Sequence, residues 1–336
     1  MADRVLVTGG AGFIGLNVAR RAVRDGARVT LVDNFERGAE DEELRSFLSA
    51  NPDVRLIRAD LRRTESYELL EGPYDRIFHL AAMLSIQAAA RRPRAVLHTN
   101  ALITLLVCDY WREQGQGALV LTSTSEAYGG LMSAASIPVP TPERVPVGFA
   151  DVTVPRTSYA ASKIFCESYV YHLAQELGLP ALIVRPHNVY GPRMGFDHVI
   201  PQMYVRLRRR EDPFRIFGAE QTRSFCFIDD FVAAVFELLR ADCAGVFHVG
   251  NDAETRVEEL AGLLFDVTGF KPEVDRRPPP EGSPARRCPD ISKLFSATGY
   301  RPETTLRAGL QETIAWYRRR LEEDPELQQL VATPFA

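Results

Sequence analysis

The sequence predicts an α/β fold in which a Rossmann-type, doubly wound parallel sheet carries a smaller C-terminal lobe. Short apolar segments alternate with helical ones in the first half of the chain, and a glycine-rich turn follows the first of them. This alternation weakens after about residue 186. Strands separated by helices form parallel sheets covered on both faces. A chain of 336 residues is also long for a single core.

The first half supplies six expected strands and three expected helices. The strands are residues 4–8, 28–32, 54–58, 76–80, 119–123 and 181–185. The helices are residues 13–25, 95–114 and 158–177. Gly26 follows the first helix, at a position that favours glycine. We assign residues 1–186 to the sheet domain.

Residues 187–320 are expected to form the smaller lobe, with some elements interleaved with the sheet domain. Residues 215–217 form a short extended segment, and a proline- and arginine-rich loop covers residues 276–289. The expected helices of this half are residues 229–239, 257–268 and 306–321. Residues 321–336 read as a charged tail.

Composition limits the partners of the protein. Forty Lys and Arg against 44 Asp and Glu give a net charge of -4, whereas nucleic-acid binding usually needs a basic surplus. No signal peptide and no run of about 20 apolar residues is present, so we expect a cytoplasmic protein without a membrane partner. The cysteines are scattered without a CxxC pair, which predicts reduced thiols and no metal site. They are Cys108, Cys166, Cys226, Cys243 and Cys288.

The turn after the first strand has the pattern of a dinucleotide site. Gly9, Gly12 and Gly15 lie between a strand and a helix. Glycine permits the tight turn, lets the backbone approach a pyrophosphate, and allows the helix to pack on the strand. The helix N-terminus then offers free N–H groups and a partial positive charge to the phosphates.

Acidic residues follow the next two strands. Asp33 ends the second strand, where a carboxylate accepts hydrogen bonds from the adenosine ribose and repels a 2′-phosphate. This favours NAD over NADP, and we expect Asp33 to outweigh the nearby positive charge of Arg37. Asp60 and Leu61 follow the third strand, where they would contact the adenine, although Asp60 is equally explained as a loop carboxylate.

Tyr159 and Lys163 stand four residues apart, so a helix places them on one face. A phenol has an ordinary pKa of about 10, but a neighbouring ammonium and an oxidised nicotinamide both favour the phenolate. The phenolate can then take a hydroxyl proton as hydride leaves the same carbon. Such a pair alone is weak evidence. Residues 122–126, Thr-Ser-Thr-Ser-Glu, strengthen it because they end a core strand at the ligand-binding edge.

Together these features resemble the extended short-chain dehydrogenases/reductases of the nucleotide-sugar epimerase, dehydratase and decarboxylase group. The resemblance runs from the glycine turn to Trp316 and Tyr317. The landmarks between them are residues 79–82, Asn100, the set Thr124, Tyr159 and Lys163, residues 188–193 and residues 221–225.

The resemblance implies NAD as the cofactor. Its implied binding set is Gly9, Gly12, Phe13, Ile14, Gly15, Asp33, Asn34, Asp60, Leu61, Leu80, Ala81, Ala82, Asn100, Ser123, Tyr159, Lys163 and Pro186. Within this set, residues 80–82 would line the nicotinamide riboside and Ser123 would lie beside the ring. Lys163 would hold the ribose and tune Tyr159.

The resemblance also implies the catalytic and substrate-binding residues. The implied catalytic set is Thr124, Ser125, Glu126, Tyr159 and Lys163, with Thr124 bonded to the reacting hydroxyl. In the lobe, Phe217 would lie near the base of a nucleotide-sugar, and Asn188, Val199, Arg223 and Arg287 would hold its diphosphate. The full implied substrate set is Ser85, Asn188, Val199, Phe217, Arg223 and Arg287. Guanidinium groups suit a diphosphate because each donates paired hydrogen bonds.

Members of this group oxidise a sugar carbon, usually C4. Our hypothesis from the sequence is 4-epimerisation of a UDP-sugar, with UDP-glucuronate a candidate; the alternatives are UDP-glucuronate decarboxylation and NDP-sugar 4,6-dehydration. Ser125-Glu126 resembles decarboxylases and dehydratases. However, residues 83–86 lack the proline-containing run of decarboxylases, and dehydratases usually have Asp where Ser125 stands.

Two further expectations concern class and assembly. A non-catalytic dinucleotide sensor is the remote alternative, because a fold alone does not establish chemistry; such proteins typically lose the tyrosine or the lysine. Helices 95–114 and 158–177 resemble the pair that forms a four-helix dimer interface, which implies a homodimer. Their apolar residues fit core packing equally well, namely Leu102, Leu105, Leu106 and Tyr169.

Overall fold

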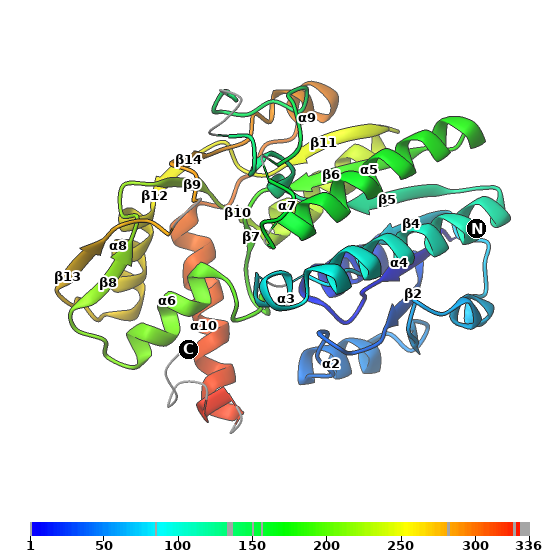
Figure 1. Ribbon diagram of the computed structural model, residues 1–336. Coiled ribbons are helices and arrows are strands. Elements are labelled where there is room, and N and C mark those ends of the chain that lie inside the picture. The colour runs from blue at the N-terminus through cyan, green and yellow to red at the C-terminus, as the bar shows by residue number, and fades with distance from the viewer. Residues whose placement is uncertain are drawn as a thin grey trace.

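A seven-stranded parallel sheet forms the centre of the computed structural model (Figure 1), which describes residues 2–84, 86–132, 137–149, 151–155, 157–280, 283–324 and 327–329. The strand order is β11-β6-β5-β4-β1-β2-β3. The strands are β1 (Arg4–Thr8), β2 (Arg28–Asp33), β3 (Arg55–Arg58), β4 (Arg76–His79), β5 (Ala118–Thr122), β6 (Ala181–Pro186) and β11 (Gly245–Val249). The predicted fold class is confirmed, and the six predicted strands differ from the observed ones by one residue at most at either end.

The order of strands reverses beside β1. Thr8, the last residue of β1, lies between Val32 of β2 and His79 of β4. The chain passes outward along one side of the sheet from β1 to β3 and then returns to β4 on the other side. In open parallel sheets this reversal leaves a crevice at the carboxyl ends of the strands, where ligands bind.

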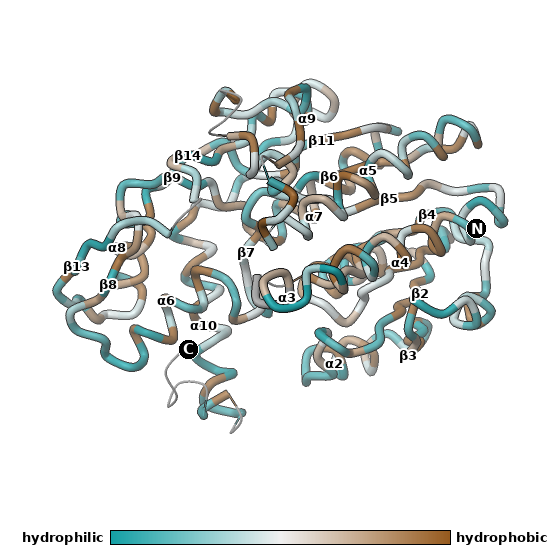
Figure 2. The backbone as a smooth tube through the Cα atoms, viewed as in Figure 1, coloured by the Kyte–Doolittle hydropathy of each residue, from teal (hydrophilic) through white to brown (hydrophobic). Residues whose placement is uncertain are grey.

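Helices cover both faces of the sheet because successive side chains of a strand point to opposite faces. Val5 and Val7 of β1 join one apolar cluster with helices α1 (Phe13–Arg24) and α7 (Ile228–Arg240). Leu6 joins the other cluster, with helices α4 (Pro93–Gln114) and α5 (Thr157–Leu177). Figure 2 colours much of β5 brown, which marks hydrophobic residues.

The remaining small elements border these layers. They are α2 (Glu42–Ala50), η1 (Thr64–Leu69), α3 (Ile86–Arg91), η2 (Ser125–Tyr128) and α9 (Ser292–Thr298).

Most of the second half forms a lobe beside the carboxyl edge of the sheet (Figure 1). Its strands pair as β10-β7, β12-β9-β14 and β13-β8. They are β7 (Val189–Tyr190), β8 (Phe214–Phe217), β9 (Thr222–Ser224), β10 (Cys226–Phe227), β12 (Glu254–Arg256), β13 (Val274–Arg277) and β14 (Arg286–Arg287). The helices are α6 (Val199–Arg208), α8 (Val257–Thr268) and α10 (Leu306–Glu323).

Some elements from the second half of the chain belong to the sheet domain and not to the lobe. β11 pairs with β6, and α7 packs on the sheet, although both come from the range that we expected to form the lobe. The predicted loop 276–289 is partly wrong, because β13 ends inside it and β14 pairs with β9. In the described part of the chain no helix is both long and apolar enough to cross a bilayer, and all five cysteines are free thiols.

His79 ties three elements together inside the sheet. Its Nδ1 lies 3.0 Å from Thr8 Oγ1, and its Nε2 lies 3.0 Å from Thr104 Oγ1 on α4. Thr8 Oγ1 accepts hydrogen bonds from the amides of Leu80 and Ala81, so its hydroxyl proton is directed to His79. Burial, together with the charge of Lys163, lowers the pKa of His79 from 6.5 to about 3.

The unfolded chain therefore binds a proton at residue 79 below pH 6.5 while the folded chain stays neutral there. Since the unfolded state binds more protons in this range, stability falls as the pH decreases. Between about pH 7.5 and about pH 5.5, His79 should account for a loss of about 1.4 kcal/mol. Urea unfolding of a His79→Gln variant should show that much less pH dependence than the parent. His98→Gln, at an exposed site on α4, is the control; equal slopes for the parent and His79→Gln would contradict the prediction.

Candidate active site

The glycine turn leaves no space for side chains. A Cβ on Gly15 would lie 2.2 Å from the carbonyl oxygen of Gly9, and one on Gly9 would lie 3.0 Å from the amide nitrogen of Ala81. Gly9 also has φ +70°, which glycine adopts at little cost. Gly12 stands at the N-cap of α1, so the unpaired amides of the first turn face the crevice end of the sheet. This bare turn fits the pyrophosphate of a dinucleotide.

Asp33 is held by the turn itself. Its Oδ2 accepts from the amide of Ala11 at 3.0 Å and its Oδ1 from the amide of Phe35 at 2.8 Å. Burial raises its pKa, and these amides oppose that effect. Its position at the end of β2 fits a contact with the adenosine ribose.

Two other residues of the predicted adenosine end have partners of their own. Asp60 Oδ2 lies 2.7 Å from Arg62 Nη2, and hydrogen bonds from Arg62 lower the pKa of that carboxyl. The side chain of Asn34 is exposed and accepts from the amide of Glu36. Asp60 therefore forms an ion pair within its own loop, and its contact with the adenine stays a prediction.

Asn100 fixes the segment that would line the nicotinamide. Its Oδ1 accepts from the amide of Met83 at 2.7 Å, and its Nδ2 donates to Ser162 Oγ at 3.0 Å and to the carbonyl of Met83. All of its donor hydrogens are used in this way. Asn100 thus anchors residues 80–83, which are half-buried, to α4 and α5.

Tyr159 and Lys163 lie one turn apart on α5, as predicted. Lys163 is buried, and its Nζ donates to the carbonyl of Thr122 at 2.8 Å, at the end of β5. Tyr159 hydrogen-bonds the side chain of Thr124, the residue that caps η2 and accepts from the amide of Glu126. The predicted Thr124, Tyr159 and Lys163 therefore meet where β5 ends.

Burial raises the pKa of the Tyr159 phenol, and the guanidinium of Arg37 offsets only part of that rise. Burial also lowers the pKa of the Lys163 ammonium, which is directed at Thr122. The phenol is protonated at neutral pH in this state. Its ionisation requires additional positive charge, of the kind that an oxidised nicotinamide supplies.

Arg37 has a neighbour that the sequence interpretation missed, because we weighed it only as a positive charge near Asp33. It interacts electrostatically with Tyr159 and with Asp197, which follows β7 in the chain. The positive charge of Arg37 thus acts on the phenol of Tyr159.

A second group that the sequence interpretation missed lies behind Ser123. Ser123 donates to Glu167, and Glu167 also accepts from Arg185 Nε at 2.8 Å. Arg185 donates in turn to the hydroxyl of Tyr128, which lies 2.7 Å from His248 Nε2. The spacing of Glu167 four residues after Lys163 was the available sequence signal. This buried network fixes the backbone that follows β5.

Glu126 and Arg287 bring the catalytic turn and the lobe together. Arg287 Nη1 lies 2.6 Å from Glu126 Oε1. Arg287 on β14 is also the register partner of Arg223 on β9, so both predicted substrate arginines come from one small sheet. Asn188, with φ +42°, donates to the carbonyl of Ser224, the next residue of β9. Four predicted residues from distant parts of the chain therefore converge.

Several polar atoms at this convergence have no partner within the described residues. They are both ring nitrogens of His187, Oγ of Ser224 and Nε of Arg287, and all are buried. Burial, with the nearby charges of His248, Arg287 and Arg185, keeps the pKa of His187 well below its ordinary value. Orphaned polar atoms of this kind are normally satisfied by ordered water or by a ligand.

The remaining predicted residues belong to the substrate, cofactor and catalytic sets. Val199 at the start of α6 and Phe217 at the end of β8 expose large apolar side chains, 41% and 49% respectively. Pro186 ends β6 and is half-buried beside Val249. Ser125 is buried at the start of η2. Ser85 lies outside the described residues.

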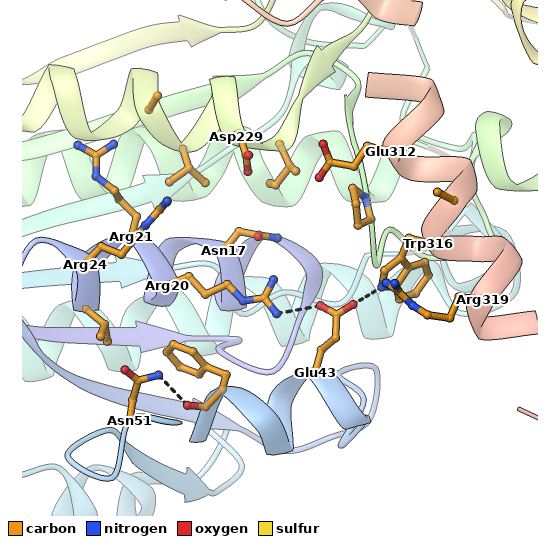
Figure 3. Close-up of a pocket in the computed structure, with 17 residues that line it drawn as sticks. Asn17, Arg20, Arg21, Arg24, Glu43, Asn51, Asp229, Glu312, Trp316 and Arg319 are labelled. Carbon is orange, nitrogen blue, oxygen red and sulfur yellow. Dashed lines mark hydrogen bonds and ion pairs between the residues drawn. The ribbon is translucent and has the colours of Figure 1, made fainter. Parts of the chain in front are cut away.

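A groove of about 630 Å³ lies elsewhere, between α1, α2, α7 and α10 (Figure 3). Glu43 crosses it and accepts from Arg20 Nη2 at 2.8 Å and from the indole N–H of Trp316. None of the residues that we predicted for cofactor, catalysis or substrate lines this groove. It belongs to the junction between the sheet domain and α10.

Comparison with known sequences identifies the relatives of this chain. A profile of the NAD dependent epimerase/dehydratase family matches residues 5–250. UDP-glucuronic acid decarboxylase 2 of Arabidopsis thaliana is 31% identical over 323 residues, which cover 96% of this chain and 69% of that protein. UDP-N-acetyl-alpha-D-glucosaminuronate decarboxylase of Bacillus cytotoxicus is 30% identical over 335 residues, covering 96% of this chain and all of that protein.

Solved structures with the same fold include enzymes of two other activities. UDP-glucose 4-epimerase of Thermotoga maritima, solved with UDP-glucose, superposes with a TM-score of 0.82 at 29% identity over 95% of this chain and 99% of that chain. The dTDP-glucose 4,6-dehydratase DesIV of Streptomyces venezuelae, solved with NAD, gives 0.83 at 26% identity over 96% of this chain and 99% of that chain.

The close approach at Gly15 generates a test of the turn. Gly15→Ala would place Cβ against backbone of Gly9, so the turn must open. We expect NAD affinity to fall by about 10-fold or more, because the amides lose their alignment. Titration calorimetry measures this. Gly262→Ala on α8, where an added Cβ meets nothing within 4 Å, should leave NAD affinity unchanged and stabilise slightly. Unchanged NAD affinity in Gly15→Ala would contradict the prediction.

Proposed function

Because the chain belongs to the NAD dependent epimerase/dehydratase family and uses NAD, we propose that it oxidises a UDP-uronic acid at C4 and releases its C6 carboxylate as CO₂. The observation that carries this proposal is the Glu126–Arg287 pair, which lies next to Thr124 in the catalytic turn. A guanidinium at that place suits a carboxylate on the sugar. The similarity to two uronic acid decarboxylases supports the same assignment.

The chemistry follows from the position of the ketone. Bound NAD would accept the hydride of C4 and later return it. Tyr159 removes the proton from O4, and Thr124 holds that oxygen by a hydrogen bond. The C4 ketone makes the sugar a β-keto acid, so the C5–C6 bond breaks and its electron pair passes into the C4–C5 enolate. A proton delivered to C5 from the side of Glu126 then restores the ketone before its reduction.

The lobe would hold the nucleotide while this occurs. Arg223 and Asn188 lie near Arg287 through the pairing of β9 with β14 and the hydrogen bond from Asn188 to Ser224. We assign the diphosphate to Arg223 and Asn188 and the nucleotide base to the exposed ring of Phe217. Arg287 would then be shared between the diphosphate and the sugar carboxylate.

4-Epimerisation, the reaction that we placed first from the sequence, remains the second candidate. The superposition on UDP-glucose 4-epimerase favours it. Epimerisation requires the keto sugar to rotate and to receive the hydride on its opposite face. A carboxylate held by Arg287 would oppose this rotation, so we place decarboxylation ahead.

A substrate panel distinguishes the two. With UDP-glucuronate and NAD, we expect a product lighter by the mass of CO₂, identified as a pentose by NMR. A product of unchanged mass with inverted C4 would instead establish epimerisation. Arg287→Lys keeps the charge but loses the paired donors, so it should weaken the binding of UDP-glucuronate more than that of UDP-glucose, which has no carboxylate. Equal effects on both sugars would contradict a carboxylate contact.

Tyr159→Phe tests the base. The variant lacks the hydroxyl that removes the proton, so kcat should fall by about 10²- to 10⁴-fold. NAD affinity should fall far less than kcat, because the glycine turn is untouched. Measurement of kcat and of the NAD dissociation constant on one preparation separates the two effects. Undiminished kcat would overturn the role of Tyr159.

We also propose that the protein is a homodimer that pairs through α4 and α5. Their inner faces pack on the sheet, whereas Leu97, Phe165 and Tyr171 expose 40%, 44% and 42% of their surface. Phe165→Glu should convert the dimer into a monomer in sedimentation velocity. Phe295→Glu, at an exposed aromatic on α9, is the matched control and should leave the dimer intact. A monomeric parent would contradict this proposal.

A further inference from the structure

Arg193 is buried, and all five of its N–H groups have acceptors. Nε donates to Asp41 Oδ2 at 2.7 Å, and Nη2 donates to Asp41 Oδ1 at 3.0 Å and to the carbonyl of Ala39 at 2.9 Å. Nη1 donates to the carbonyls of Ala11 and Gly12 at 2.9 and 3.1 Å. The guanidinium therefore joins the glycine turn to the segment before α2.

The two carbonyls determine how the turn presents its amides. In a trans peptide the C=O of one residue and the N–H of the next point in opposite directions. The carbonyl of Gly12 accepts from the amide of Leu16 at 3.1 Å and from Arg193 at 3.1 Å. Together these bonds direct the N–H of Phe13, the first amide of α1, to the other side. That amide is among those with no acceptor inside the helix, so it is free for a phosphate oxygen.

Asp41 holds the guanidinium of Arg193 from the side opposite the glycine turn. We call the contacts of Arg193 with Asp41 and with the turn the clamp. It caps α2 by accepting from the amide of Leu44 at 3.0 Å, and its side chain is only 8% exposed. The first turn of α2 contains Glu43, which Figure 3 shows between Arg20 and Trp316. The acceptors of Arg193 are therefore held by packing between α1, α2 and α10.

The backbone of Arg193 is unusual as well. It has φ +72°, in the left-handed region that is unfavourable for residues with a side chain. Arg193 comes three positions after the end of β7, and four residues separate it from the predicted substrate residue Asn188. Its five hydrogen bonds hold it in this conformation.

We propose that Arg193, with Asp41, is a positioning residue that orients the amides of the glycine turn for the pyrophosphate of NAD. Its N–H groups all donate to protein acceptors, so it would act through the turn and not on the substrate. The clamp acts on the cofactor turn, so it is independent of which sugar reaction the protein performs.

Binding measurements on the full chain test the clamp without any turnover. In Arg193→Lys the charge remains, but one ammonium cannot reach all five acceptors. The dissociation constants of NAD and ADP-ribose should rise by roughly 10- to 100-fold, as expected for lost hydrogen bonds of a charged group. The affinity for adenosine, which lacks phosphate, should stay unchanged. Arg206, on α6 in the lobe, has a similar paired contact with Glu211, and Arg206→Lys should affect none of the three ligands.

Asp41→Asn keeps an oxygen that can cap α2 but loses the charge that faces Arg193. It should shift ADP-ribose affinity in the same direction by a smaller factor and again spare adenosine. This second variant also serves if Arg193→Lys fails to fold. Equal losses for adenosine and ADP-ribose would mean that Arg193 merely supports the fold, and unchanged ADP-ribose affinity in folded Arg193→Lys would overturn the proposal.

Discussion

The structure depends on the contact between the β1–α1 turn and the end of β4. The turn must pass beside Ala81 with no side chain on Gly9, and α1 must begin against the carbonyl of Gly9 with none on Gly15. These contacts fix α1 relative to the sheet where the strand order reverses. Because all parallel strands end at one edge, the residues after β2, β4 and β5 then meet at the first amides of α1. Asp33, residues 80–83 and Thr124 reach the crevice for this reason.

Burial determines the pKa values of the ionisable residues at the carboxyl edge of the sheet. Tyr159 and Lys163 lie in a region that opposes charge, so the pKa of the phenol is raised and that of the ammonium is lowered. Because its pKa is raised, the phenol of Tyr159 stays neutral until a cation such as the oxidised nicotinamide occupies the crevice. In the proposed mechanism, proton removal from the sugar is thereby linked to an oxidised cofactor, because the reduced ring carries no positive charge. The buried Glu167–Arg185 pair holds the end of β5 in place, and its two charges compensate each other.

The sequence allowed six strands of the sheet and the glycine turn between β1 and α1 to be predicted, because their determinants are local. The glycines of the turn and the Tyr159–Lys163 pair act through spacings within one turn or one helix. The contacts that we did not predict join residues far apart in the chain: Arg193 to Asp41 across 152 positions and Arg287 to Glu126 across 161. β14 was missed because it has two residues in a proline-rich stretch and forms only by pairing with β9. Local periodicity carries no information about such partners.

The segment from β6 to Arg193 connects the substrate lobe to the glycine turn. Pro186 ends a strand of the main sheet, Asn188 bonds to the lobe strand β9, and Arg193 bonds to the glycine turn. Only a few residues separate the lobe contact from the cofactor contact, and Asn188 and Arg193 both have positive φ. A shift of the lobe that moved Asn188 would therefore pull on Arg193, since so short a segment with a defined backbone cannot absorb it. Binding at the lobe and binding at the turn are in this way expected to stabilise each other through one stretch of backbone.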